Sequence, residues 1–228
     1  MKALLYKEFK LAMHPICYVF VFAFPFMILI PNYPIAIGFI YVLTCYPILF
    51  LGANKGQQSN DLLFSTLLPV RKKDIVLARI ATVSIIQFTN VLLTTALYPV
   101  ALLIQNAIVS QGAPAQSPGL GLDGFVSVLA IVLVGFAIAD LIFFPIYYKK
   151  GKSIVMSTLL TIVVFIVYLS ILTIGVPYIP GCEGYVDLLC HSGVGIQFAF
   201  LGGALLIYLV AHFLVYKISA KRLELVDF

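Results

Sequence analysis

Three polar side chains stand inside long apolar runs of the sequence, where an isolated polar group is costly. Asp140 is the only acidic residue in such a run, and Gln87 and Asn90 lie in another run at a similar depth. An unpaired carboxylate in an apolar medium must face protein or water, or be protonated. We therefore expect these three residues to form a polar layer, either as a packing network or as part of a transport path.

Two of the four cysteines, Cys182 and Cys190, lie eight positions apart in a segment that contains turn residues. An oxidising exterior permits a disulfide between them, and two free thiols are the alternative. His14 and His212 lie near the ends of apolar runs and His191 lies between runs, without a second His or a Glu on the same helical face. The sequence therefore predicts neither a metal site nor a catalytic residue.

The composition identifies the medium in which these residues must sit. Of the 228 residues, 62% are hydrophobic and only 10% are charged, whereas soluble domains carry roughly 25% charged residues. A surface with so little charge faces lipid rather than water, so the chain is predicted to be an integral membrane protein. The net charge of +5 then follows membrane orientation and does not indicate nucleic-acid binding.

Six apolar runs predict six membrane-spanning helices in one all-α domain over residues 1–228. Most runs approach the roughly 20 residues needed to cross a hydrocarbon layer of about 30 Å, and no second domain, linker or internal repeat interrupts them. The predicted spans are Ile16–Ile30, Ile35–Ala53, Ile80–Ile104, Phe125–Tyr148, Ile154–Val176 and Val194–Tyr216.

All 14 lysines and arginines fall on one side of this six-span plan. They lie before the first span, between the second and third, between the fourth and fifth, and after the sixth. The other three connections contain none. By the positive-inside rule, both termini and the connection between the second and third spans are cytoplasmic.

A short basic segment precedes the first span. Lys2–Met13 carries apolar residues at helical spacing, which predicts an interfacial helix that lies on anionic lipid through Leu5, Phe9 and Met13.

The connection between the second and third spans holds a second short amphipathic helix. Ser59 and Asn60 are good helix caps, and Pro69 ends the helix because its ring cannot continue the hydrogen-bonded turns. Leucines four residues apart give this helix an apolar face, and helical character resumes after Lys73. The pattern predicts a cytoplasmic coupling helix joined rigidly to the third span, with contact residues Asp61, Leu62, Leu63, Phe64, Leu67 and Leu68.

This segment resembles a known family. The run LLPVRKKDIVLARI is similar to a signature before the third span of small six-span permeases of the type-2 class of ABC exporters, and LLYKEFKL resembles their amino-terminal cytoplasmic helix. Arg71 stands where that signature has a serine. This difference leaves the predicted rigid connection between the coupling helix and the third span intact. The chain has no GxxxxGK[ST] sequence for ATP phosphates.

The resemblance implies a permease subunit in a bacterial plasma membrane that binds no cofactor itself. A separate ATPase subunit would hold ATP and Mg and dock on the coupling helix, and a second copy or a paralogue would complete the permease. The subgroup implies export of amphipathic peptides such as toxins or antimicrobial peptides, with lipids or drugs left open. The alternative is an autonomous transporter or channel driven by a gradient, in which Asp140 carries the proton. An intramembrane enzyme lacks the paired catalytic residues that it would need.

Overall fold

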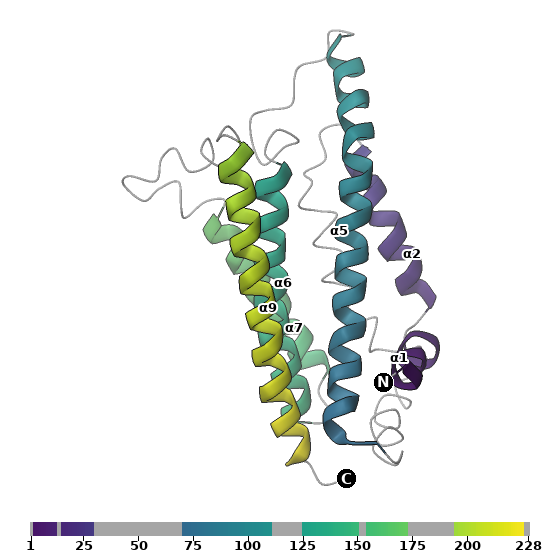
Figure 1. The fold of residues 1–228 in the computed structure, drawn as a ribbon, viewed down its shortest axis with the longest axis vertical. Helices are drawn as coiled ribbons and strands as arrows, with labels where there is room; N and C mark the ends of the chain where they lie inside the picture. The colour runs from purple at the N-terminus through teal and green to yellow at the C-terminus, as the bar shows by residue number, and fades with distance from the viewer. Residues whose placement is uncertain are drawn as a thin grey trace.

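The computed structural model describes residues 2–12, 15–29, 70–110, 125–150, 154–172 and 194–225. Every regular element within these ranges is helical, which confirms the all-α prediction for the described part of the chain (Figure 1). The elements are α1 (Lys2–Lys7), the π-helical turn η1 (Glu8–Ala12), α2 (Pro15–Ala23), the 3₁₀-helix η2 (Phe24–Leu29), α5 (Lys72–Ser110), α6 (Phe125–Lys150), α7 (Ile154–Ser170) and α9 (Val194–Glu224).

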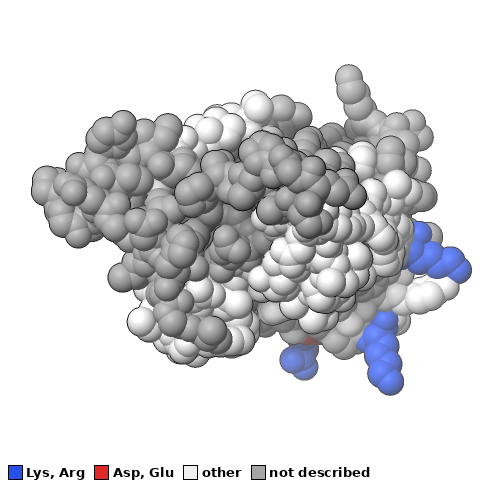
Figure 2. Space-filling model, turned by 90° about the horizontal axis from the view of Figure 1, so that it is seen from above, with Lys and Arg blue, Asp and Glu red and all other residues white. Residues whose placement is uncertain are grey.

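The long helices α5, α6 and α9 run side by side, with α2 beside α5 and α7 behind α6 (Figure 1). Both termini, the first turn of α5 and the last turns of α6 and α9 lie at one end of the bundle. We call this the basic end, because Lys72, Lys73, Lys149, Lys221 and Arg222 lie there. Viewed from the opposite end, charged side chains, most of them basic, are seen only at the margin of the described surface (Figure 2).

Three described helices are long and apolar enough to cross a membrane: α5, α6 and α9. They correspond to the predicted third, fourth and sixth spans. The first and fifth predicted spans are present as the shorter apolar helices Tyr18–Leu29 and Met156–Ser170. The second predicted span lies outside the described residues, so the number six stays a prediction.

Two helices extend beyond their predicted spans at the basic end. α5 begins at Lys72 rather than at Ile80, and α9 continues past Tyr216 to Glu224. Asp74 places an acid in the first turn of α5, and α9 has Lys221 and Arg222 in its last turn. Both arrangements complement the helix dipole, so the helices remain stable where the chain becomes charged.

The core lies around α6, which packs against α9 on one side and α7 on the other. The most apolar part of α6 is 67% buried, compared with 22% for α9. Gly135 allows the close approach of α7, since a Cβ atom there would lie 2.6 Å from Cε2 of the buried Phe165 ring. α6 is therefore the central helix of the described bundle.

Hydroxyl groups on α5 are satisfied within the helix. Five serine and threonine hydroxyls each donate to the carbonyl oxygen four residues earlier, at 2.7 to 3.0 Å, so that these five are paired in the apolar surroundings. The donors are Thr82, Ser84, Thr89, Thr94 and Thr95.

Candidate functional site

A buried ion pair joins the amino-terminal segment to α5 near the basic end. Arg79 donates from Nε to Glu8 Oε2 at 2.9 Å and from Nη2 to Glu8 Oε1 at 3.2 Å. Its third nitrogen, Nη1, donates to the hydroxyl oxygen of Tyr147 on α6 at 3.0 Å. Lys7 Nζ lies 3.7 Å from Glu8 Oε1. We call these four residues the basal ion cluster.

The basal ion cluster is almost completely excluded from solvent. The side chains of Arg79 and Glu8 are 3% and 4% exposed. The two parallel hydrogen bonds match the planar guanidinium to both carboxylate oxygens, which is the strongest and most directional form of this pair. Removing either partner would leave a buried charge uncompensated. The cluster therefore holds η1, α5 and α6 together.

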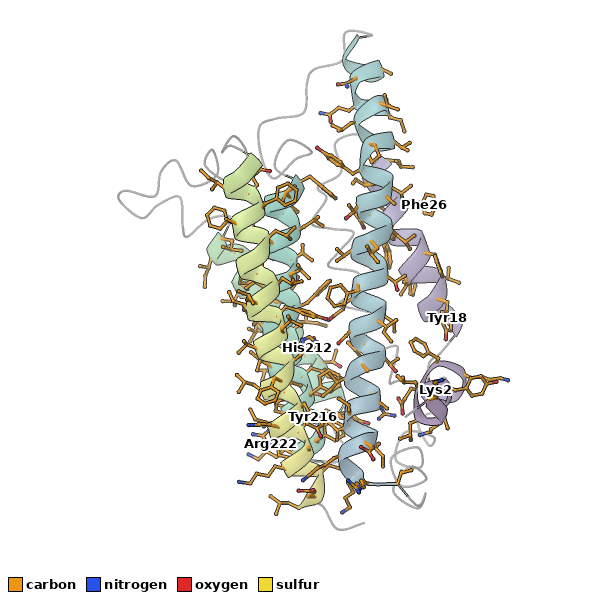
Figure 3. The ribbon with its side chains drawn as sticks, in the orientation of Figure 1. Lys2, Tyr18, Phe26, His212, Tyr216 and Arg222 are labelled. Atoms are coloured by element: carbon orange, nitrogen blue, oxygen red, sulfur yellow. The ribbon has the colours of Figure 1, made fainter. Side chains whose placement is uncertain are left out.

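A second polar cluster lies deeper in the bundle and contains the predicted Asp140. Gln87 of α5 donates from Nε2 to Asp140 Oδ2 at 3.2 Å and accepts a hydrogen bond at Oε1 from the hydroxyl of Tyr208. His212 Nε2 lies 3.2 Å from the same Asp140 oxygen, and in Figure 3 this histidine is on the inner side of α9. We call Gln87, Asp140, Tyr208 and His212 the bundle polar cluster.

The contacts of His212 show where a proton could be shared with Asp140. His212 Nδ1 lies 3.0 Å from the carbonyl oxygen of Tyr208, and a carbonyl oxygen can only accept, so Nδ1 carries hydrogen. Nε2 lies 3.2 Å from Asp140 Oδ2 but does not form a hydrogen bond in this geometry. A proton on either the nitrogen or the carboxylate would make the contact between α6 and α9 favourable.

Asn90 belongs to a different contact from Gln87 and Asp140. Pro25 has no N–H, so the carbonyl oxygen of Val21, four residues earlier, loses its usual helical donor. Asn90 Nδ2 donates to this oxygen at 3.4 Å. Asn90 is fully buried, and its contact fastens α5 to the point where α2 changes to the 3₁₀ geometry of η2.

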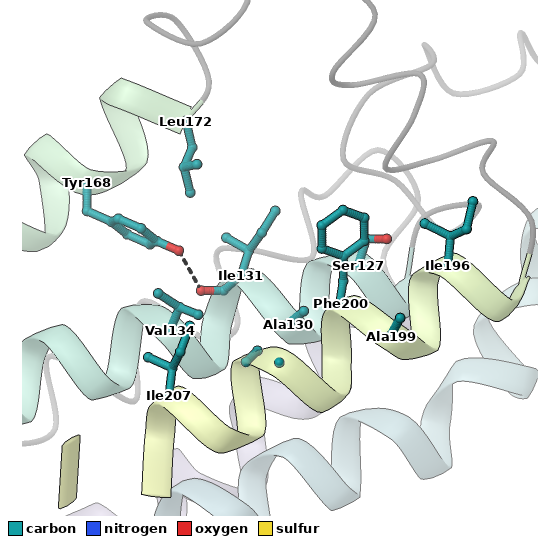
Figure 4. Close-up of a pocket in the computed structure, with 12 residues that line it drawn as sticks. Ser127, Ala130, Ile131, Val134, Tyr168, Leu172, Ile196, Ala199, Phe200 and Ile207 are labelled. Atoms are coloured by element: carbon teal, nitrogen blue, oxygen red, sulfur yellow. Dashed lines mark hydrogen bonds between the residues drawn. The ribbon is translucent and has the colours of Figure 1, made fainter. Parts of the chain in front are cut away.

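An apolar groove lies between α6, α7 and α9, in the half of the bundle away from the basic end (Figure 4). Its volume is about 450 Å³. Tyr168 lines this groove, and its hydroxyl donates to the carbonyl oxygen of Ile131 at 2.9 Å. The lining residues are Ser127, Ala130, Ile131, Val134, Tyr168, Leu172, Ile196, Ala199, Phe200, Gly203, Ala204 and Ile207.

The structure brings some of the predicted site residues together and separates others. Gln87 and Asp140 are hydrogen-bonded, whereas Asn90 contacts Val21 of α2. Leu5 and Phe9 are half-buried on α1 and η1, and Phe9 packs against the core. The remaining predicted residues lie outside the described side chains: Met13, Asp61, Leu62, Leu63, Phe64, Leu67, Leu68, Cys182 and Cys190.

Sequence reasoning missed the partners of the two buried charges. His212 has a partner after all, Asp140, although the two lie on different helices and share no sequence pattern. Both residues precede the basic end of their helix by about two to three turns, and this matched depth is the signal that pairs them. Glu8, the only acid before the first span, is a similar signal for Arg79. No group of three His, Cys, Asp or Glu suited to a metal gathers within the described ranges.

Comparison with known protein families shows to which family the chain belongs. A family model described as ABC-2 family transporter protein matches residues 3–221, and the comparisons with curated proteins and with solved structures found no match. The matched region contains the basal ion cluster, the bundle polar cluster and the three long apolar helices, except for the last three residues of α9. The chain therefore belongs to the ABC-2 family of transporter proteins and is a multi-pass membrane permease.

Proposed function

We propose that this permease is the membrane subunit of an ATP-driven exporter, coupled through residues 61–68 to a separate ATPase subunit that binds ATP and Mg. The observation that carries the proposal is the continuity of α5. This helix begins at Lys72, three residues after Pro69, and continues unbroken for 39 residues. A force applied to the preceding segment would therefore act directly on a spanning helix.

α5 is long enough to transmit a movement from the basic end into the membrane-spanning part of the bundle. At about 1.5 Å per residue the helix is about 58 Å long, so it exceeds the hydrocarbon layer of about 30 Å. Its base carries Arg79 of the basal ion cluster, and two turns further along it carries Gln87 of the bundle polar cluster. A tilt of α5 would reach both clusters, because each is hydrogen-bonded to it.

The remaining architecture in the proposal is six spans in a plasma membrane, with both termini cytoplasmic and a second permease copy or paralogue alongside. The gathering of described basic residues at one end supports this orientation. One face of α9 is apolar and uncovered in the single chain, with Leu206, Val210 and Phe213 each more than half exposed. Such a face must contact lipid or another membrane helix.

The proposed substrate is an amphipathic peptide, such as a toxin or an antimicrobial peptide. A drug or a lipid is the alternative substrate of the same exporter. The resemblance of LLPVRKKDIVLARI to the peptide exporters suggests this class. The groove in Figure 4 adds physical support, since its lining is apolar except for Ser127 and Tyr168. Its chemistry suits an apolar side chain or acyl chain better than an ion.

Copurification with the ATPase tests the coupling. We expect a tagged permease to retain a nucleotide-hydrolysing subunit, and Leu63→Asp or Phe64→Asp to lose it, because a carboxylate would have to be buried in the docking groove. Leu225→Asp is the matched control: this leucine is apolar, at the basic end and 76% exposed. Retention of the ATPase by both coupling variants would disprove the proposed contact.

A second candidate, a gradient-driven transporter without an ATPase, is favoured by the close approach of two buried titratable groups, Asp140 and His212. It predicts that the permease alone, reconstituted in vesicles, moves protons down an imposed pH gradient. Asp140→Asn should abolish this movement while assembly is preserved, since the asparagine amide oxygen can still accept the hydrogen bond from Gln87. Proton flux equal to that of empty vesicles would eliminate this candidate.

A further inference from the structure

We propose that the basal ion cluster fixes α1 and η1 to the base of α5, so that the amino-terminal helix and α5 move as one body during transport. Glu8 and Arg79 are positioning residues in this view. The part that concerns motion rests on the proposed ATP-driven function, whereas the fixed attachment can be tested on the permease alone.

The first observation is the division of α1 and η1 into two sides. Lys7 and Glu8 are buried against α5, although both are charged residues in the first turns of the chain. Tyr6 is 61% exposed, and Lys10 on the same side donates to its hydroxyl at 2.6 Å. The segment therefore presents a charged side to α5 as well as a side to the surroundings, which an independent interfacial helix would not require.

The second observation is the geometry of the attachment. A single hydrogen bond lets a side chain rotate about the bond, whereas the two bonds between Arg79 and Glu8 fix the plane of the guanidinium. The third bond, to Tyr147, fixes that plane relative to α6 as well. Because all of these groups are excluded from water, no solvent molecule offers a replacement partner during a movement.

The third observation is an ion pair at the same end that has the opposite properties. Lys73 of α5 lies 3.3 Å from Glu224 of α9, with side chains 54% and 47% exposed. Exposed pairs of this kind contribute little and exchange readily with water. At the basic end, α5 is thus joined to η1 by a buried ion pair and to the end of α9 by an exposed one. We therefore expect α1 and η1, rather than the end of α9, to follow α5.

The test measures two distances with spin labels in the permease purified with its ATPase, after the four native cysteines are replaced by serine. One pair, Tyr6→Cys with Leu92→Cys, reports α1 against α5. The other, Leu225→Cys with Leu92→Cys, reports α9 against α5. All three positions are more than half exposed. We expect the first distance to be the same without nucleotide and after trapping with ATP and vanadate, and the second to shift.

Variants separate the attachment from general stability. Glu8→Gln should replace the single α1–α5 distance by a broad distribution. Arg79→Lys keeps the charge but loses the paired hydrogen bonds, and it should broaden the distribution less. Lys73→Gln, in the exposed pair, should leave it unchanged. If Glu8→Gln fails to assemble, Arg79→Lys and the two states of the wild-type complex still decide the matter.

The outcomes are distinct for the two proposals. A nucleotide-dependent change in the α1–α5 distance of the wild-type complex, or an unchanged distribution in Glu8→Gln, would overturn the fixed attachment. The absence of a copurifying ATPase, or the absence of any nucleotide-dependent shift in either distance, would overturn the proposed function. In that case the distributions of wild type and Glu8→Gln, measured on the permease alone, still test the attachment.

Discussion

Arg79 and Asp140 are buried charged side chains with different kinds of partner. Arg79 meets a carboxylate of opposite charge in a bidentate pair near the membrane boundary. Asp140 lies deeper and is surrounded by groups that are neutral or exchange protons, namely Gln87, Tyr208 and His212. The paired full charges thus lie toward the basic end, and the carboxylate deeper in the bundle lies among polar groups.

Replacing Arg79 by lysine tests how much the paired hydrogen bonds of the planar guanidinium contribute to stability. Lysine keeps the positive charge but cannot bond both Glu8 oxygens and Tyr147 in one plane. We expect the free energy of unfolding, measured by denaturant unfolding in detergent, to fall by about 1.5–3 kcal/mol, the range for hydrogen bonds to charged groups. Lys73→Arg, at the exposed pair, serves as the control and should change it little. Equal effects at the two sites would contradict the role assigned to the fork.

The contact between Asn90 and Val21 predicts an unusual dependence on Pro25. Asn90→Leu should destabilise the protein by about 1–3 kcal/mol, because it leaves a buried carbonyl oxygen without a donor. Pro25→Ala restores the backbone N–H that normally bonds this oxygen, so Asn90→Leu should cost less in the Pro25→Ala background. A double-mutant cycle on unfolding free energies measures the coupling, and strictly additive effects would refute it.

Residue types and depth predicted part of these sites. That Asp140 needs polar neighbours followed from the cost of an isolated carboxylate, and Gln87 is indeed one of them. The other two, Tyr208 and His212, come from α9, 68 and 72 positions further along the chain. Which helices are adjacent depends on packing between whole faces, and apolar sequences in a membrane carry little periodic signal of that packing.

At the scale of elements, α5 is a single rod from the charged connection to the far end of the bundle. The sequence predicted this rigid link, because the helical pattern resumes after Lys73 and continues into a long apolar run. The extra turns of α9 beyond Tyr216 were not predicted, since the apolar run ends there while helical propensity continues through Lys217–Glu224. Hydropathy marks the limits of the membrane, whereas caps and breakers mark the limits of a helix.

The contact between α6 and α7 predicts a strong difference between two glycines. Gly135→Ala would place its Cβ 2.6 Å from Phe165, whereas a Cβ at Gly203 would have no atom within 4 Å. We expect Gly135→Ala to cost about 1–3 kcal/mol through overpacking and Gly203→Ala to be neutral, by the same unfolding measurement. Adding Phe165→Leu should recover part of the loss at Gly135. Equal stability of the two alanine variants would contradict the packing described for α7.

At the scale of the whole molecule, the position of every lysine and arginine implies an orientation, and the described basic residues do share one end of the bundle. The structure describes helices for five of the six predicted spans, and neither the second span nor the coupling helix is among the described residues. The membrane side of that end therefore stays a prediction, as does the pairing of Cys182 with Cys190.

Thiol labelling in intact cells checks both predictions. After reduction, a membrane-impermeant maleimide should label Cys182 and Cys190 from outside, whereas Leu225→Cys should react only after the cells are permeabilised. Without reductant the native pair should resist labelling, and its mass should rise by two hydrogens on reduction. Labelling of Leu225→Cys in intact cells would reverse the orientation, and free thiols without reductant would exclude the bridge.

The 3₁₀ geometry of η2 changes how far the first hydrophobic segment reaches. Its nine α-helical residues and six 3₁₀ residues rise about 13 Å and 12 Å, whereas an ordinary helix of the same length would rise about 22 Å. By winding more tightly the chain gains about 3 Å, so that residues 15–29 cover about 25 Å of a hydrocarbon layer of about 30 Å. Fewer residues are therefore needed to reach a given depth than in an ordinary α-helix.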